Sequence, residues 1–110
     1  MVTIYKEGTF EAAHKLANHP KCGYLHGHSY RYEVWLTGET QGNWGFVLDF
    51  HEIKLYFDKY DHSDDVIMIS AERLVQDAAQ HFFKMRDNIK KVKIRVWETK
   101  TAYAETELSY

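Results

Sequence analysis

The chain has 110 residues, a length that suits one domain built around one hydrophobic core. Hydrophobic residues make up 45% of it and charged residues 27%, a composition typical of folded globular proteins rather than disordered chains. A formal net charge of −2 argues against a nucleic-acid binder that relies on a broad basic surface. One cysteine excludes an intrachain disulfide, and no apolar run approaches the roughly 20 residues of a membrane span. Since MVTIYKEGTF lacks a secretory signal, we expect a cytoplasmic protein with neither a membrane nor a nucleic-acid partner.

Two strands are predicted in the first third of the chain, over residues 2–14 and 28–38. Both are rich in β-branched and aromatic residues. In the second, apolar residues alternate with Arg31, Glu33, Trp35 and Thr37, which predicts one buried and one more polar face. Between the strands, residues 16–27 contain one proline and two glycines, so we expect an irregular loop there.

Two helices are predicted next, over residues 50–60 and 71–86. Asp49 and Glu52 have the spacing of a capping box at the first helix start, and Ser70 is a candidate cap for the second. Apolar residues recur at helical intervals in both. They are Phe50, Ile53, Phe57 and Tyr60 in the first helix, and Leu74, Ala78 and Phe82 in the second.

Alternating segments at residues 92–97 and 101–108 predict two further strands. The element order is therefore strand, strand, helix, helix, strand, strand. Strands grouped at both ends with helices between them favour the α+β class, with an antiparallel sheet and both helices packed on one face.

Two histidines one residue apart lead into the second predicted strand. Alternation along a strand directs His26 and His28 to the same face, where they can bind one ion together. A catalytic zinc site usually has three protein ligands and one open position, and His14 at the end of FEAAH is the natural third candidate. Alternatively, the pair is a chance pattern on a half-exposed strand. No ligand role is assigned to His19, His51 or His81.

The only cysteine, Cys22, precedes His26 by four residues in the stretch KCGYLHGHSY. A lone cysteine is more often a small buried apolar residue than a reactive group. On a glycine-containing loop beside predicted metal ligands, it can instead bring a thiol close to the metal without binding it.

Five motifs in chain order resemble the 6-pyruvoyl-tetrahydropterin synthase family: FEAAH, CGYLHGH, GFVLDF, DH and WETKT. The resemblance covers nearly the whole chain. The Cys-x-x-x-His-Gly-His spacing is most similar to the bacterial 6-carboxy-5,6,7,8-tetrahydropterin synthase branch, which serves the 7-deazaguanine pathway toward queuosine.

The resemblance implies a T-fold over residues 1–110, in which a four-stranded antiparallel sheet carries two helices on one side. It implies a homo-oligomer, a trimer or a hexamer, with active sites shared between neighbouring subunits. It also implies a Zn²⁺ site, a catalytic thiol with an Asp-His pair, and a glutamate that anchors the pterin. By residue, the metal ligands are His14, His26 and His28, the catalytic groups are Cys22, Asp61 and His62, and the anchor is Glu98.

The implied reaction converts 7,8-dihydroneopterin triphosphate to 6-carboxy-5,6,7,8-tetrahydropterin, with release of triphosphate and acetaldehyde. Zinc would act as a Lewis acid on the side-chain hydroxyls, Cys22 as a base, and His62, held by Asp61, as a proton relay. Lys15, Lys21 and Arg31 are candidates for the triphosphate, although charged residues are mostly solvated surface.

The sequence leaves three alternatives open: the sister 6-pyruvoyl-tetrahydropterin synthase activity, an inactive zinc-containing T-fold protein that binds pterins or purines, and a structural domain with incidental histidines. One segment departs from the family pattern. After the Asp-His pair, IMISAER offers Ser70 and Glu72 but lacks the proline, threonine and asparagine of the family's Pro-Thr-x-Glu-Asn-like helix start.

Overall fold

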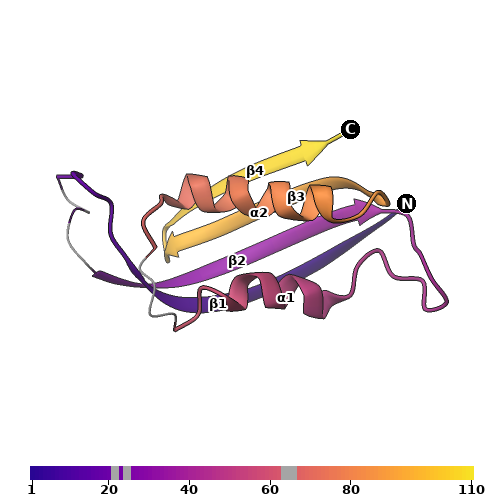
Figure 1. Ribbon diagram of the computed structural model, residues 1–110, viewed down its shortest axis with the longest axis horizontal. Coiled ribbons are helices and arrows are strands. Elements are labelled where there is room, and N and C mark those ends of the chain that lie inside the picture. Colours follow the sequence, from indigo (N-terminus) through magenta and orange to yellow (C-terminus); the bar gives the residue numbers. More distant parts are fainter. Residues whose placement is uncertain (21–22, 24–25, 63–66) are drawn as a thin grey trace.

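The computed structural model describes residues 1–20, 23, 26–62 and 67–110. Four strands form one antiparallel sheet in sequence order, and two helices lie across one of its faces (Figure 1). The strands are β1 (Val2–His14), β2 (His26–Gly38), β3 (Ile89–Thr99) and β4 (Ala102–Ser109). The order ββααββ confirms the α+β prediction.

The strands match their predicted positions with small differences at the ends. β2 begins at His26 rather than at residue 28, because it continues its pairing with β1 until His26 lies opposite His14. Gly27 therefore belongs to a strand and not to the predicted loop. β3 is longer than its alternating segment, running from Ile89 to Thr99.

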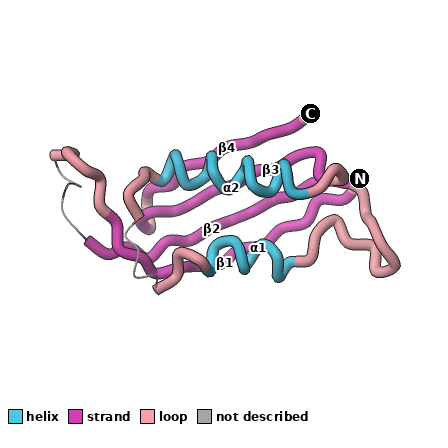
Figure 2. The backbone as a smooth tube through the Cα atoms, viewed as in Figure 1, coloured by secondary structure: helices cyan, strands magenta, loops and turns pink. Residues whose placement is uncertain are grey.

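Both predicted helices are present, and each begins at a side-chain cap (Figure 2). α1 (Phe50–Asp58) follows Asp49, whose Oδ1 accepts the backbone N–H of His51 at 3.0 Å. α2 (Ala71–Met85) follows Ser70, whose hydroxyl accepts the N–H of Arg73 at 3.2 Å. The segment that departs from the family pattern thus still starts a helix. In the described part of the chain, neither helix has the length and apolarity that crossing a membrane requires.

The hydrophobic core lies between the helices and the sheet. Ile53 and Phe57 of α1 and Leu74, Ala78 and Phe82 of α2 are buried, as their spacing predicts. Phe50, which shares their helical spacing, is 49% exposed at the first turn of α1. Tyr56 is buried in its place, with its ring 5.3 Å from that of Phe82. From the sheet, the core takes the alternate residues of β2 and β3: Tyr30, Tyr32, Val34, Leu36, Val92, Ile94 and Val96.

One end of the sheet brings separate parts of the chain together. β1 ends there, β2 begins there and β3 ends there, as their antiparallel registers require. The segment before α2 joins the same end, because the N–H of Ile67 donates to the carbonyl of Ala13 and the N–H of Lys15 donates to the carbonyl of Ile67. This end carries the predicted site residues that the structure describes.

Candidate metal centre and adjoining hollow

His14 is fixed in place at the last position of β1. Its side chain is only 1% exposed, and its Nε2 lies 3.1 Å from the carbonyl oxygen of Ile69. If Nε2 carries the proton and donates to this carbonyl, Nδ1 holds the lone pair of the neutral ring. A backbone carbonyl that fixes the tautomer in this way is typical of histidines that bind metals. The geometry therefore suits His14 to metal binding through Nδ1.

His28 and Glu98 approach this nitrogen from the neighbouring strands. Glu98 Oε1 lies 3.6 Å from His14 Nδ1 and 3.3 Å from His28 Nε2. The rings of His14 and His28 are 5.4 Å apart and tilted by 54°, so they converge without stacking. Ligand atoms of the three side chains all lie within 4.8 Å of one another.

The donor set fits a divalent transition metal. Imidazole nitrogens and a carboxylate oxygen are common zinc ligands, with bond lengths of about 2.0–2.2 Å. The three candidate ligands surround one point at the end of the sheet, and β1, β2 and β3 each contribute one of them. Imidazole ligands also suit copper, nickel and iron, so the donor set by itself does not select zinc.

The prediction for His26 is supported only by the position of its backbone, which lies opposite His14 in the β1–β2 ladder. Cys22, the predicted thiol base, lies outside the described residues, as does Lys21. Their roles remain predictions.

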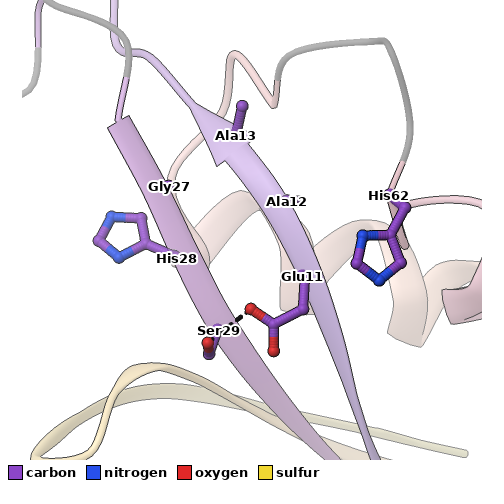
Figure 3. A pocket seen from close by; sticks show the side chains of 7 residues that line it. All are labelled: Glu11, Ala12, Ala13, Gly27, His28, Ser29 and His62. Carbon is purple, nitrogen blue, oxygen red and sulfur yellow. Dashed lines mark hydrogen bonds between the residues drawn. The ribbon is translucent and has the colours of Figure 1, made fainter.

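A hollow of about 540 Å³ lies beside His28, and His62 faces it (Figure 3). The close-up shows His28 and His62 extending on either side of the β1–β2 pair. The hollow is lined by Glu11, Ala12, Ala13, Gly27, His28, Ser29 and His62. The hollow is therefore bordered by the strand position of one candidate metal ligand, His28, and by one half of the predicted Asp-His pair, His62.

The edge of β1 positions the Asp-His pair. Asp61 Oδ1 accepts the backbone N–H of Glu11 at 2.8 Å, and the N–H of His62 donates to the carbonyl of Glu11 at 2.8 Å. These two bonds hold His62 in a left-handed backbone conformation, with φ of 49°. Its side chain is 76% exposed, and its Nε2 lies 3.7 Å from Asp61 Oδ1. An imidazole placed in this way can exchange protons with a bound molecule.

Two residues that line the hollow were not anticipated from the sequence. Glu11 lies on β1 directly opposite Ser29 on β2, and the serine hydroxyl donates to Glu11 Oε2 at 2.6 Å. Alternation along FEAAH would place Glu11 on the face opposite to the core residue Phe10. Only the register of the two strands brings it to Ser29.

The two candidates for a triphosphate contact that the structure describes, Arg31 and Lys15, are not among the residues that line this hollow. Arg31 lies on the helix-free face of the sheet, with its Nη2 3.2 Å from Glu7 Oε2 and 3.8 Å from Glu33 Oε2. The hydrogen bond to Glu7 raises the pKa of the Arg31 guanidinium, and Coulombic attraction to Glu33 and Glu7 adds to this while burial opposes it. Lys15 is exposed beyond the end of β1.

A family model described as 6-pyruvoyl tetrahydropterin synthase matches residues 3–108, nearly the full chain. The chain belongs to this family. The 6-carboxy-5,6,7,8-tetrahydropterin synthase of Synechocystis sp. is 44% identical over 63 residues, which are 53% of this chain and 49% of that protein. The protein of the same name from Haemophilus influenzae is 27% identical over an alignment covering 96% of this chain and 98% of the relative.

Similarity to solved structures agrees with the family membership at the level of the fold. The 6-pyruvoyl tetrahydropterin synthase of Plasmodium falciparum superposes with a TM-score of 0.71, covering 99% of this chain and 98% of that one at 20% identity. The predicted T-fold is therefore confirmed.

Proposed function

We propose that this family member is a metal-dependent pterin lyase that converts 7,8-dihydroneopterin triphosphate to 6-carboxy-5,6,7,8-tetrahydropterin, releasing triphosphate and acetaldehyde. The observation that carries the proposal is the convergence of His14, His28 and Glu98 at one end of the sheet, where His28 and His62 also border a hollow. Relatives named 6-carboxy-5,6,7,8-tetrahydropterin synthase support the choice of product. So does the Cys-x-x-x-His-Gly-His spacing that begins at Cys22.

In this proposal Zn²⁺ is held by His14, His26 and His28. When bound, the ion supplies Lewis acidity, which stabilises negative charge on the oxygens of the substrate side chain. The contact from Ile69 supports the role of His14, because it orients the ring and places a proton on Nε2, which directs Nδ1 toward the metal.

The remaining residues divide the proton transfers and the recognition of the ring. Cys22 removes a proton from the substrate side chain, since a thiolate forms more easily near a metal ion. His62, held at the hollow by the contacts of Asp61 with β1, returns or relays protons. Glu98 accepts hydrogen bonds from the 2-amino and N3 positions of the pterin. We further propose that the chain, as one T-fold domain, forms a trimer or a hexamer with active sites between subunits.

Product analysis tests the proposal directly. Purified protein of known metal content is incubated with 7,8-dihydroneopterin triphosphate, the products are identified by mass spectrometry and acetaldehyde is assayed. We expect carboxy-tetrahydropterin together with acetaldehyde, and no turnover by Cys22→Ala protein that still holds its metal. Exposed His51, on the outer side of α1, provides a control variant, since His51→Ala should behave as wild type.

The same assay separates the alternatives. A 6-pyruvoyl product without acetaldehyde would assign the sister activity. Metal and pterin binding without turnover would assign the protein to the binding-only class and contradict the proposed lyase. An active Cys22→Ala variant would remove the thiol from the mechanism while leaving the reaction in place.

A further inference from the structure

Glu98 lies among the histidines rather than apart from them, which a role limited to anchoring a ring does not require. Its Oε1 is 3.3 Å from His28 Nε2 and 3.6 Å from His14 Nδ1. A tetrahedral ion with bonds of about 2.0–2.1 Å separates its ligand atoms by roughly 3.3–3.4 Å, since the tetrahedral edge is about 1.6 times the bond length. The separation from His28 has this value, and the separation from His14 is about 0.2 Å longer.

The distances fit hydrogen bonding less well. Charge-assisted N–H···O bonds between an imidazole and a carboxylate are typically about 2.7–2.9 Å long, and N–H···O bonds in general extend to about 3.2 Å. Both separations exceed this range. One carboxylate oxygen thus lies within 3.6 Å of two ring nitrogens, an arrangement in which all three atoms can bind one ion.

The backbone around Glu98 holds the carboxylate in this position. The register of β3 with β4 shifts between Trp97 and Thr99, so Glu98 has no partner across this pair. Such irregularities bend a strand and redirect a side chain. The preceding residue is anchored on the opposite face, where Trp97 Nε1 donates to Glu33 at 2.8 Å.

We propose that Glu98 is a fourth ligand of the metal in the substrate-free protein. The inference rests on the metal site of the proposed function and extends it. Histidine nitrogens and Glu98 would then complete a four-coordinate site without solvent. Glu98 would then help to hold the metal in the substrate-free protein and turn to the pterin ring when substrate binds.

Cobalt(II) substitution tests the inference without any turnover. Metal-free wild type, Glu98→Gln and Glu98→Ala proteins are titrated with Co²⁺, and affinity is measured by competition with a chelator. The visible d–d spectrum reports coordination number, because four-coordinate Co²⁺ absorbs more strongly than five- or six-coordinate Co²⁺. Glu107→Gln is the matched control, since this carboxylate lies on β4 and pairs with Lys91 at 3.0 Å.

Wild type and Glu107→Gln should give the same intense four-coordinate spectrum. Both Glu98 variants should bind Co²⁺ at least about tenfold more weakly, the smallest loss that even outer-shell partners cause, and their spectra should change as solvent replaces the carboxylate. Unchanged spectra in the Glu98 variants would overturn the ligand role even if affinity fell, and the histidine site of the proposed function would stand. Failure of wild-type protein to bind either Co²⁺ or Zn²⁺ would overturn both proposals.

Discussion

Two clusters of polar side chains lie on the same strands but on opposite faces of the sheet. At its end, on the helix-covered face, His14, His28 and Glu98 converge from β1, β2 and β3. Nearer the middle, on the helix-free face, Glu33 of β2 is only 7% exposed. The two clusters differ in the kind of group that surrounds each carboxylate.

In the Glu33 cluster, donors surround one carboxylate. Trp97 Nε1 donates to Oε1 at 2.8 Å and the Tyr5 hydroxyl donates to Oε2 at 2.8 Å, while Arg95 and Arg31 lie 3.6 Å and 3.8 Å away. Burial alone would raise the pKa of Glu33, but the hydrogen bonds from Trp97 and Tyr5 and the two positive charges outweigh it, so the pKa is lowered. A carboxylate with this many donors is satisfied within the protein.

The histidine cluster has the opposite character. Two imidazoles and a carboxylate, all of them groups that can bind a cation, meet here, and among the described residues no arginine or lysine forms an ion pair with Glu98. Groups that direct lone pairs to one point are suited to binding a cation. A carboxylate surrounded by hydrogen-bond donors of the protein is suited to a structural role. The comparison predicts that variants at the histidine cluster affect metal and activity, while variants at Glu33 affect stability.

The largest effect is expected from His28→Ala. Loss of one imidazole from a site with few ligands should abolish stoichiometric metal retention after purification, because each ligand contributes a large part of the affinity. Metal analysis of wild type, His28→Ala and the exposed control His51→Ala provides the measurement. Full metal occupancy in His28→Ala would contradict the assignment of metal binding to the histidine cluster.

The second effect concerns proton transfer at the hollow. His62→Asn should lower the rate of turnover by about 10²–10⁴-fold, the range typical of a general acid or base, while metal content stays unchanged. Asparagine suits this position because it tolerates the left-handed backbone, with φ of 49°, better than most residues. Turnover by His62→Asn at the wild-type rate would assign the proton relay to another group.

Much of this molecule follows from local patterns in the sequence. Alternation in β2 predicts the buried Tyr30 and Val34, and helical spacing predicts the buried Leu74 and Phe82. The cap at Ser70 is equally local, because it depends on a residue at the start of its own helix. The family motifs then identify His14 and His28, which the strand register brings together.

The remaining features depend on contacts that no local pattern specifies. Alternation places Glu33 on the more polar face, but the four long side chains around it leave it buried there. The Ile69 carbonyl that orients His14 belongs to the backbone, so residue identity carries no sign of it. The approach of Glu98 to the histidines depends on the β3 end and its shifted register with β4.

A third prediction tests the structural role of Glu33. Glu33→Gln should lower the free energy of unfolding at neutral pH by about 1–3 kcal/mol, because it weakens charge-assisted hydrogen bonds and leaves two arginines less well balanced. The native carboxyl has a lowered pKa, so its contribution is present above the usual value of 4.5 and is lost as the pH falls through the native pKa. The difference between variant and wild type should therefore shrink in acid.

Denaturant unfolding of both proteins at pH 7 and near pH 3 measures this difference. Metal content should be the same in wild type and Glu33→Gln. A variant as stable as wild type at neutral pH would show that the donors around Glu33 find equivalent partners in solvent. Loss of metal in this variant would instead show that Glu33 affects the metal site on the other face of the sheet, through Trp97, which bonds Glu33 and precedes Glu98.

The smallest effect is expected at the β3–β4 surface pair. Lys91 Nζ lies 3.0 Å from Glu107 Oε1, and both side chains are about half exposed. Exposed pairs of this kind contribute about 0–1 kcal/mol, because water screens the charges and ordering two long side chains costs entropy. Glu107→Gln should therefore change the free energy of unfolding by less than Glu33→Gln, and added salt should reduce the change further. Glu107 is exposed and has no comparable set of donors around it. Equal destabilisation by the two variants would therefore show that burial and surrounding donors do not explain what Glu33 contributes to stability.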